Sequence, residues 1–298
     1  GTRRSKLNSI PTNAAVNGVI QMTIRLKPAE DWSGVVVDEA GRPVHGATVA
    51  LTTMQVSSLS TANASVLKDE QITALQTADV AALSSSSLRA LGSAQLQALT
   101  TDQVLAMVTA QFAAMSTFNV SSLGTVQVAA LYTKDIAALS TAQLSALTVD
   151  QAVALRTDQA QAIATQQAVA LGTAQLVSME TQDFAALSTN SIAALLTAQI
   201  AALTSDELVA LRSDQAQALT VYQTWALTTA QWVALETADI AQINTYGVSV
   251  LNTYGLQSLK TAQIVALRTD QALYLTTAQT AVLTTAQWFA LETADIGQ

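Results

Sequence analysis

Few residues in this chain of 298 could carry acid–base, nucleophilic or metal chemistry. The sequence has one histidine, His45, and no cysteine. A histidine needs a partner to act as a general base or to complete a metal site, and no second His and no Cys is available. The absence of cysteine also excludes disulfides and thiolate metal sites. We therefore interpret His45 as an ordinary residue of a turn-rich stretch.

The 21 acidic residues are spread along the chain rather than clustered. They recur at the second, fourth and fifth places of the repeat described below, where helix capping and solvation explain them. Glycine-rich phosphate loops and the glycine–aspartate nonapeptides of calcium-binding β-rolls are absent from the sequence. The sequence therefore predicts no catalytic residue, no cofactor and no metal site, and a protein that is not an enzyme.

The composition excludes two further classes of partner. Charged residues make up only 11% of the chain and the net charge is −8, whereas binding to nucleic acid needs clustered Lys and Arg. Thr and Gln interrupt every apolar run before it reaches the length of a bilayer span, so we expect no membrane insertion. Because the chain begins at Gly1, we expect a processed or excised segment whose targeting sequence lies outside it.

A strict repeat of eight residues organises most of the sequence. Residues 51–298 divide into 31 consecutive octads whose first place is Leu in 26 cases and Met or Ile in the others. The third place is Thr or Ser in 28 octads, the fifth is Gln in 19, and the eighth is Ala in 21. Such a gapless register predicts a solenoid in which each unit buries its apolar face against its neighbours.

The octad length indicates short helices with a break in each repeat. Eight residues of continuous α-helix advance about 800°, so the Leu row would drift by about 80° per octad and never form one face. We expect each helix to run from the fourth place to the next Leu, with the third-place Thr as N-cap. Residues suited to a left-handed helix stop occupy the second place in five octads: Gly92, Gly124, Gly172, Asn244 and Asn252.

The predicted fold is mainly α, a solenoid of very short helices built from the 31 octapeptide repeats and preceded by a small β segment. Ala at the seventh and eighth places favours helix over strand. The alternative is a β-solenoid, since Thr, Val and Ile suit strands and Gln can form ladders. Eight octads carry Thr at the second place, and β-branched residues avoid positive φ, so those turns must be built without a left-handed stop.

The first fifty residues differ from the octads in composition and pattern. Residues 1–12 are polar and basic, and we interpret them as a flexible arm. Residues 13–50 are interpreted as a small β region and a possible strand-exchange segment. Within it Ile20, Met22, Ile24 and Leu26 alternate with polar residues, as in a half-buried strand. Residues 35–37 and 47–51 are further strand candidates, and residues 51–298 form the octad domain.

Two stretches resemble known families. Residues 34–49, GVVVDEAGRPVHGATV, resemble the opening half of the carboxypeptidase-regulatory-like β-sandwich domains of bacterial surface proteins. The later strands of that family are missing because the octads begin in their place, which implies an incomplete sheet. The Leu/Thr/Ala/Gln octads resemble the repeat regions of large bacterial secreted or cell-surface proteins of the adhesin type. This resemblance implies an extracellular or cell-surface location.

A longer period of 56 residues, or seven octads, lies over the repeat. Arginine recurs at this step in the second place, and glutamate recurs there three octads later. The positions are Arg156, Arg212, Arg268, Glu180, Glu236 and Glu292. Either a seven-octad unit was duplicated, or seven octads match a whole number of solenoid turns. We expect each set to form a surface row of one sign that sets register between copies, although exposed ion pairs contribute little energy individually.

The fifth-place glutamines and the aromatic residues are the remaining candidates for binding. We interpret the glutamines as a structural ladder or as bonds to a neighbouring turn, because buried amides need partners and a repeat supplies the same partner each time. Trp225, Trp232 and Trp288 lie in the C-terminal third together with several tyrosines. Core packing is the first interpretation of these aromatics and a subunit contact is the second.

These patterns lead to a functional hypothesis. We expect a non-enzymatic extracellular structural protein, a rod or filament subunit that self-assembles into a homo-oligomer or polymer. The alternative is an adhesin stalk or ligand-binding solenoid with an unknown surface ligand, and an ice-binding surface made of Thr rows ranks third. For assembly, the strand with Ile20, Met22, Ile24 and Leu26 is expected to complete the sheet of a neighbouring copy, head to tail.

Overall fold

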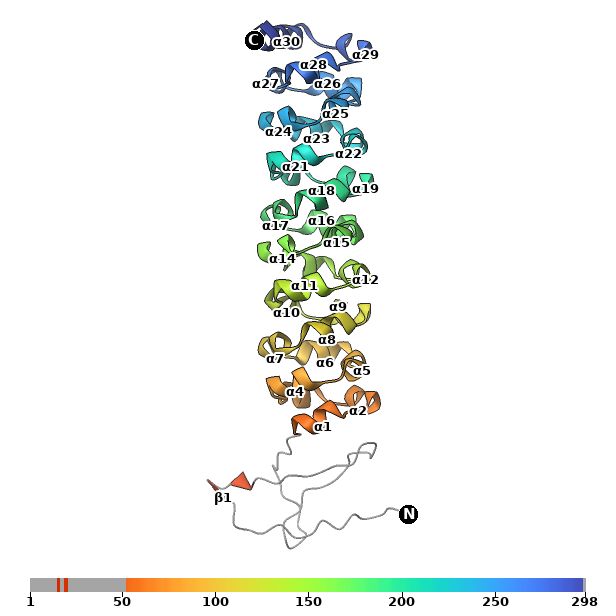
Figure 1. The fold of residues 1–298 in the computed structure, drawn as a ribbon, viewed down its shortest axis with the longest axis vertical. Helices are drawn as coiled ribbons and strands as arrows, with labels where there is room; N and C mark the ends of the chain where they lie inside the picture. The colour runs from red at the N-terminus through yellow and green to blue at the C-terminus, as the bar shows by residue number, and fades with distance from the viewer. Residues whose placement is uncertain (1–14, 17–18, 21–51, 297–298) are drawn as a thin grey trace.

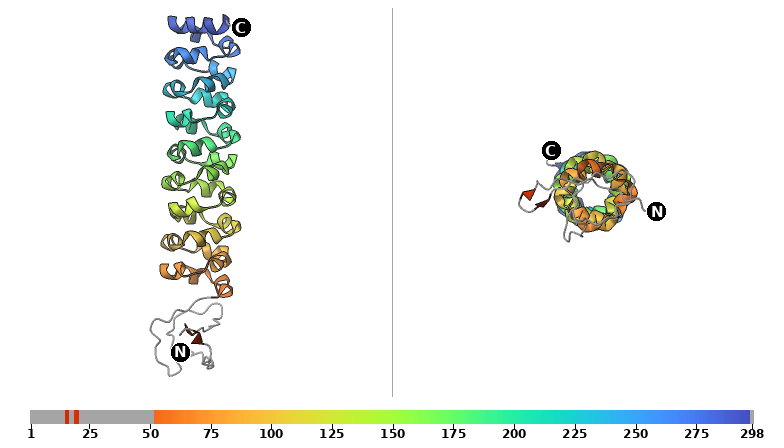
Figure 2. Two further views of the ribbon diagram at one scale, coloured as in Figure 1. Left: turned by 90° about the vertical axis from the view of Figure 1, so that its left-hand side faces the viewer. Right: turned by 90° about the horizontal axis from the view of Figure 1, so that it is seen from below.

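The computed structural model describes residues 15–16, 19–20 and 52–296. From residue 52 onward the chain is a rod, an α-solenoid in which very short helices follow one another in a superhelix about a straight axis (Figure 1). Viewed along that axis, the helices form a ring-shaped wall (Figure 2). The predicted fold class is confirmed. The β-solenoid alternative is wrong, because residues 52–296 contain no strand.

Each octad contributes one helix of four to six residues, except at the C-terminal end. The helices are α1 (Thr53–Ser57), α2 (Thr61–Ser65), α3 (Asp69–Thr73), α4 (Thr77–Ala82), α5 (Ser85–Arg89), α6 (Ser93–Ala98), α7 (Thr101–Ala106), α8 (Thr109–Ala114), α9 (Thr117–Ser122), α10 (Thr125–Ala130), α11 (Thr133–Ala138), α12 (Thr141–Ser145), α13 (Val149–Val153), α14 (Thr157–Gln161), α15 (Thr165–Ala170), α16 (Thr173–Ser178), α17 (Thr181–Ala186), α18 (Thr189–Ala194), α19 (Thr197–Ala202), α20 (Ser205–Val209), α21 (Ser213–Ala218), α22 (Val221–Ala226), α23 (Thr229–Ala234), α24 (Thr237–Gln242), α25 (Thr245–Ser249), α26 (Thr253–Ser258), α27 (Thr261–Val265), α28 (Thr269–Leu273), α29 (Thr277–Thr280) and α30 (Thr285–Ile296).

The helices begin one residue earlier than the sequence suggested. The third-place residue is the first residue of the helix, and the second-place residue is the N-cap, so the predicted third-place cap is wrong. Thr148, for example, is extended (φ −71°, ψ 163°), and its hydroxyl accepts a hydrogen bond from the Gln151 amide at 3.2 Å. The second-place threonines that argued against a left-handed stop are therefore helix caps, the role for which Thr and Ser are suited.

The helix ends also differ from the prediction, because the second-place glycines and asparagines are not left-handed. Gly92 (φ −77°), Gly124 (φ −70°) and Gly172 (φ −69°) are all extended. Asn244 and Asn252 are extended too, and their side chains accept bonds from helix amides. Two consecutive extended residues at the first and second places turn the chain between helices, and negative φ at both explains why the second place admits many residue types.

One turn of the superhelix takes about 28 residues, or three and a half octads. Helices three octads apart pack on one another throughout the rod, as α14 on α17 and α15 on α18. Side chains at the fifth place bond to main-chain carbonyls 28 residues earlier, as Gln143 does to Met115. Seven octads therefore make two full turns. This geometry supports the second interpretation of the 56-residue period, a whole number of turns.

The core consists of the first and sixth places of the octads. Leu171 and Leu176 illustrate the two places, and both are buried. Removing one such side chain from water contributes about 1.5–3 kcal/mol. The sixth place also accepts large aromatic residues, including Phe112, Phe184 and Trp232. Burial is thus spread evenly along the rod, as expected for a chain whose units contact only their neighbours.

The two ends of the described chain depart from the repeat. At the C-terminal end α30 continues through Leu291 without a break and is 12 residues long. In the N-terminal region β1 (Ala15–Val16) and β2 (Val19–Ile20) pair antiparallel, with Ala15 opposite Ile20. The predicted arm, the strand candidates at 35–37 and 47–51 and most of residues 20–27 lie outside the described residues.

Candidate assembly surfaces

The fifth-place glutamines join successive turns of the rod through one recurring contact, here called the glutamine bridge. In Gln143, Oε1 accepts from the Ser140 amide at 2.7 Å, and Nε2 donates to the carbonyls of Met115 at 2.7 Å and Phe112 at 2.8 Å. One buried side chain thus serves the start of its own helix and the end of a helix on the preceding turn. The interpretation of the glutamines as bonds between turns is confirmed.

Every fifth-place glutamine from Gln95 to Gln287 makes this bridge. Each donates to the carbonyl 28 residues earlier at 2.6–2.9 Å. Helices this short leave almost all of their main-chain groups without an internal partner. The bridge satisfies these groups at both helix ends, which explains how helices of five or six residues remain stable.

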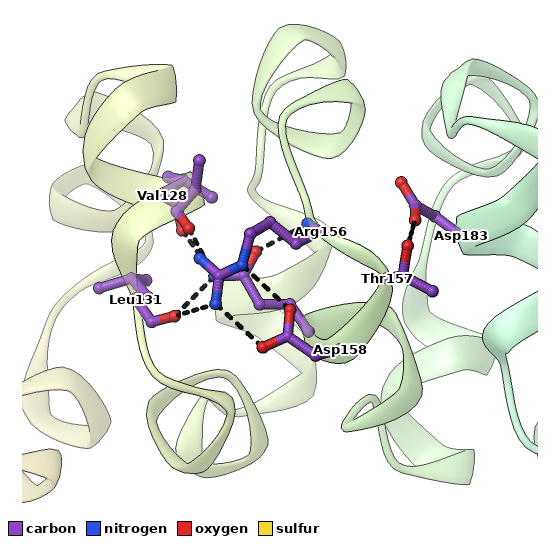
Figure 3. A network of polar contacts seen from close by, with 8 residues as sticks. Val128, Leu131, Arg156, Thr157, Asp158 and Asp183 are labelled. Carbon is purple, nitrogen blue, oxygen red and sulfur yellow. Dashed lines mark hydrogen bonds and ion pairs between the residues drawn. The ribbon is translucent and has the colours of Figure 1, made fainter.

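Aspartate at the fifth place reverses the direction of the contact. Asp183 accepts a hydrogen bond from the Thr157 hydroxyl at 2.6 Å, and Asp239 accepts from Ser213 at 2.9 Å. Figure 3 shows Thr157 pointing at Asp183 from the adjacent turn. Burial is the main cause that raises the pKa of both carboxyls, with Glu180 adding to the rise at Asp183 and Glu236 at Asp239.

The three arginines of the 56-residue period make matching contacts. Each guanidinium pairs with the aspartate two residues later: Arg156 with Asp158 at 3.0 Å, Arg212 with Asp214 at 3.1 Å, and Arg268 with Asp270 at 2.9 Å. Each also donates to a main-chain carbonyl of the preceding turn, that of Leu131, Ala185 or Ala241. Figure 3 shows Arg156 held between Asp158 and Leu131.

These contacts lower the pKa of the three paired aspartates. Hydrogen bonds from Arg156 and Arg268 are the main causes at Asp158 and Asp270. At Asp214 the largest cause is a hydrogen bond from Thr189, followed by that from Arg212.

Arginine and glutamate of the 56-residue period share one face of the rod. Helix α14, capped by Arg156, packs on α17, capped by Glu180. Arg212 then contacts α17, α21 packs on α24, and Arg268 contacts α24. Helices α14, α17, α21 and α24 lie one above another in Figure 1. Along this face the five side chains follow one another with alternating sign, and we call them the charged column; that each set forms a row of one sign which sets register between copies stays a prediction.

The role of this column in assembly stays a prediction. The structure does not describe the side chain of Glu292, the third glutamate of the 56-residue period. A hollow of about 360 Å³ opens beside the column, lined by Val153, Ala154, Leu155, Arg156, Thr157, Glu180, Gln182 and Asp183.

No group of three or more potential metal ligands occurs in the described part of the chain. None of the described helices is long and apolar enough to cross a membrane.

Exposed aromatic side chains gather over the last turns, on helices that pack on one another. Helix α22 packs on α25 and α25 on α28. We call the five side chains Tyr222, Trp225, Tyr246, Leu273 and Tyr274 the aromatic surface. They are 45–77% exposed, and the rings of Tyr246 and Tyr274 meet edge to face with their centroids 5.2 Å apart. The sequence offered core packing as the first interpretation, which fits the buried Trp232 but not these residues.

Of the four predicted strand residues, the structure describes only Ile20, which lies in β2. Met22, Ile24 and Leu26 lie outside the described residues, so strand exchange stays a prediction.

The sequence was compared with families of known proteins. The model of the ALTTAQ repeat matches four stretches, residues 72–109, 128–165, 176–213 and 232–272, which together cover just over half of the chain. The chain belongs to the ALTTAQ repeat family. The six letters of that description stand unchanged at residues 226–231, which run from the last residue of α22 to the glutamine of the next bridge. No curated protein matches the sequence.

Proposed function

We propose that this ALTTAQ-repeat chain is a non-enzymatic structural protein of the cell exterior, a stiff rod whose copies associate into larger assemblies. The observation that carries the proposal is the glutamine bridge, which recurs between Gln95 and Gln287 and joins successive turns along most of the rod. Bending the rod would stretch buried hydrogen bonds on one side while uncovering the core. A uniform rod of this kind suits a mechanical role better than a chemical one.

The aromatic surface supports association with a second copy. If each side chain is given the area of about 150–250 Å² that an aromatic one buries, the exposed parts of the five residues sum to roughly 500–800 Å². A stable interface of standard size buries about 800 Å² on each partner. Exposed patches of this size are uncommon on monomers, and Trp and Tyr are the residues that most often dominate binding energy. We infer that two copies lie side by side with these surfaces in contact.

Head-to-tail joining by strand addition remains part of the proposal, and it rests on the sequence of residues 20–27. The two contacts lead to different assemblies. A side-by-side contact between identical surfaces closes as a pair, whereas strand addition between different ends propagates as a filament.

Electron microscopy and analytical ultracentrifugation of the full chain test both contacts. The double variant Tyr222→Thr and Trp225→Ser should lose the side-by-side pair, whereas Phe118→Ser, an exposed aromatic on distant α9, should not. Deleting residues 1–27 should leave pairs of rods that form no filaments. Single rods at every concentration would overturn the assembly proposal and leave a stalk.

The second candidate is a ligand-binding stalk. The confinement of the aromatic surface to the last turns favours it, because one end of a stalk is where a ligand would be met. A soluble ligand that protects Trp225 fluorescence from a quencher while the rod stays monomeric would favour this alternative. Ice binding, the third candidate, predicts thermal hysteresis, which a freezing assay measures directly.

A further inference from the structure

One fifth-place residue keeps only half of the glutamine bridge. Glu207, in α20, has a side chain that is 1% exposed. Its Oε2 accepts from the Thr204 amide at 2.6 Å and from the Thr204 hydroxyl at 2.9 Å, as a glutamine Oε1 would. Its Oε1 is buried and has no hydrogen-bond partner, alone among the buried side-chain oxygens and nitrogens of the described residues.

The repeat identifies what faces that oxygen. Gln199 donates to the carbonyls of Leu171 and Ala168, which lie 28 and 31 residues earlier. Gln231 donates to Leu203 and Ile200 at the same spacing. The same count from Glu207 gives Met179 and Leu176, at the end of α16. Oε1 of Glu207 thus occupies the position of a donor, opposite main-chain oxygens that can only accept.

Within the part of the chain that the structure describes, no cation compensates a negative charge at this position. Helix α20 packs on α17, which brings Asp183 and its cap Glu180, and on α23, which has no titratable residue. Asp206 adjoins Glu207 in the chain, and Arg212 is engaged with Asp214 at the start of the next helix. Burial raises the pKa of Glu207, and the charge of Asp206 adds to the rise.

We propose that Glu207 is protonated in the folded rod and that Oε1–H donates to the main-chain carbonyl of Met179. The proton then completes the bridge that glutamine makes elsewhere. Loss of the proton leaves a carboxylate oxygen against carbonyl oxygens and opens the contact between α16 and α20. Glu207 is therefore a pH-dependent joint at a place where the glutamine bridges carry no titratable group.

The direction of the pH effect follows from the raised pKa. A carboxyl whose pKa is higher in the folded than in the unfolded chain stabilises the fold below the unfolded value, and this contribution is lost as the pH rises through the folded value. At pH values between the unfolded and the folded pKa of Glu207, the equilibrium constant for opening the joint grows by up to about tenfold per pH unit.

Amide hydrogen exchange of the full chain at a series of pH values tests the proposal, with Glu207→Gln as the matched variant. Comparison at equal pH cancels the intrinsic pH dependence of exchange. At acidic pH the two proteins should protect α16 and α20 equally. As the pH rises, only the wild type should lose protection there, by up to about tenfold per pH unit. Gln231→Glu should create a second pH-dependent joint between α19 and α23.

Two results would overturn the proposal. Equal protection of wild type and Glu207→Gln at every pH would show that no proton is needed. Protection that rises with added sodium or potassium chloride at constant pH, and not with acid, would show that the oxygens hold a cation instead.

Discussion

Replacing Gln143 by leucine removes one glutamine bridge while keeping a buried side chain of similar size. The variant loses three hydrogen bonds, two from Nε2 and one to Oε1. The Phe112 carbonyl keeps a bond from the Met115 amide, but the buried Met115 carbonyl loses its donor. A buried group left without a partner costs about 1–3 kcal/mol. With the Ser140 amide also released, we expect a local loss of about 2–4 kcal/mol.

Hydrogen exchange suits this test better than global denaturation, because a solenoid does not unfold in one step. Each 1.4 kcal/mol is a tenfold change in an equilibrium, so exchange in α8 and α12 should accelerate by roughly 30- to 1,000-fold. The control is Gln161→Leu, an exposed glutamine in α14, which should change exchange little. If the two variants behaved alike, the glutamine bridge would have no part in joining the turns.

Further predictions concern the caps and the titrating carboxylates. Thr148→Ala should lower the free energy of local unfolding by about 1 kcal/mol because Thr148 is an N-cap. Thr173→Ala, at the first residue of its helix, should lower it clearly less. Hydrogen exchange at a series of urea concentrations measures both changes. Asp183→Asn should stabilise the rod at neutral pH and have no effect in acid, because the raised pKa of Asp183 means that its contribution is lost as pH rises. Asp158→Asn should act in the opposite sense: its lowered pKa means that the wild-type contribution is present at neutral pH and is lost as the pH falls. Melting curves across the acid range distinguish these two signs.

The octad pattern was enough to predict short helices, because eight residues cannot keep a continuous helical face. The cap position was misplaced by one residue because Thr and Ser fill both the second and third places of many octads, as at Thr228 and Thr229. Only the conformation of the second place distinguishes the two possibilities. The glycine at 172 was also misleading, since glycine is compatible with extended as well as left-handed backbone.

The partners of the glutamines depend on the number of residues in a superhelical turn, which no local pattern states. The recurrence of Arg156 and Glu180 every 56 residues indicates the length of the turn, because residues two full turns apart lie in the same surroundings. Octad place separates Trp232, buried at the sixth place, from Trp225, exposed at the seventh. It does not account for Trp288, which is also at a sixth place but is exposed, in the long helix α30 that departs from the repeat. The charged column could not be derived in advance, because its alternating sign results from interleaving the two sets on successive turns.

The superhelical turn of about 28 residues is the central claim, and distances between spin labels at residues 62, 174 and 286 test it most directly. Alanine occupies all three positions, each is exposed, and the chain has no cysteine to compete for the label. Successive positions are fourteen octads apart, which is four turns. Helix layers pack about 8–10 Å apart, so labels at 62 and 174, and at 174 and 286, should both lie roughly 32–40 Å apart. Labels at 62 and 286 should lie at twice that distance. Unequal values for the first two pairs, or a third distance that is not their sum, would contradict the account.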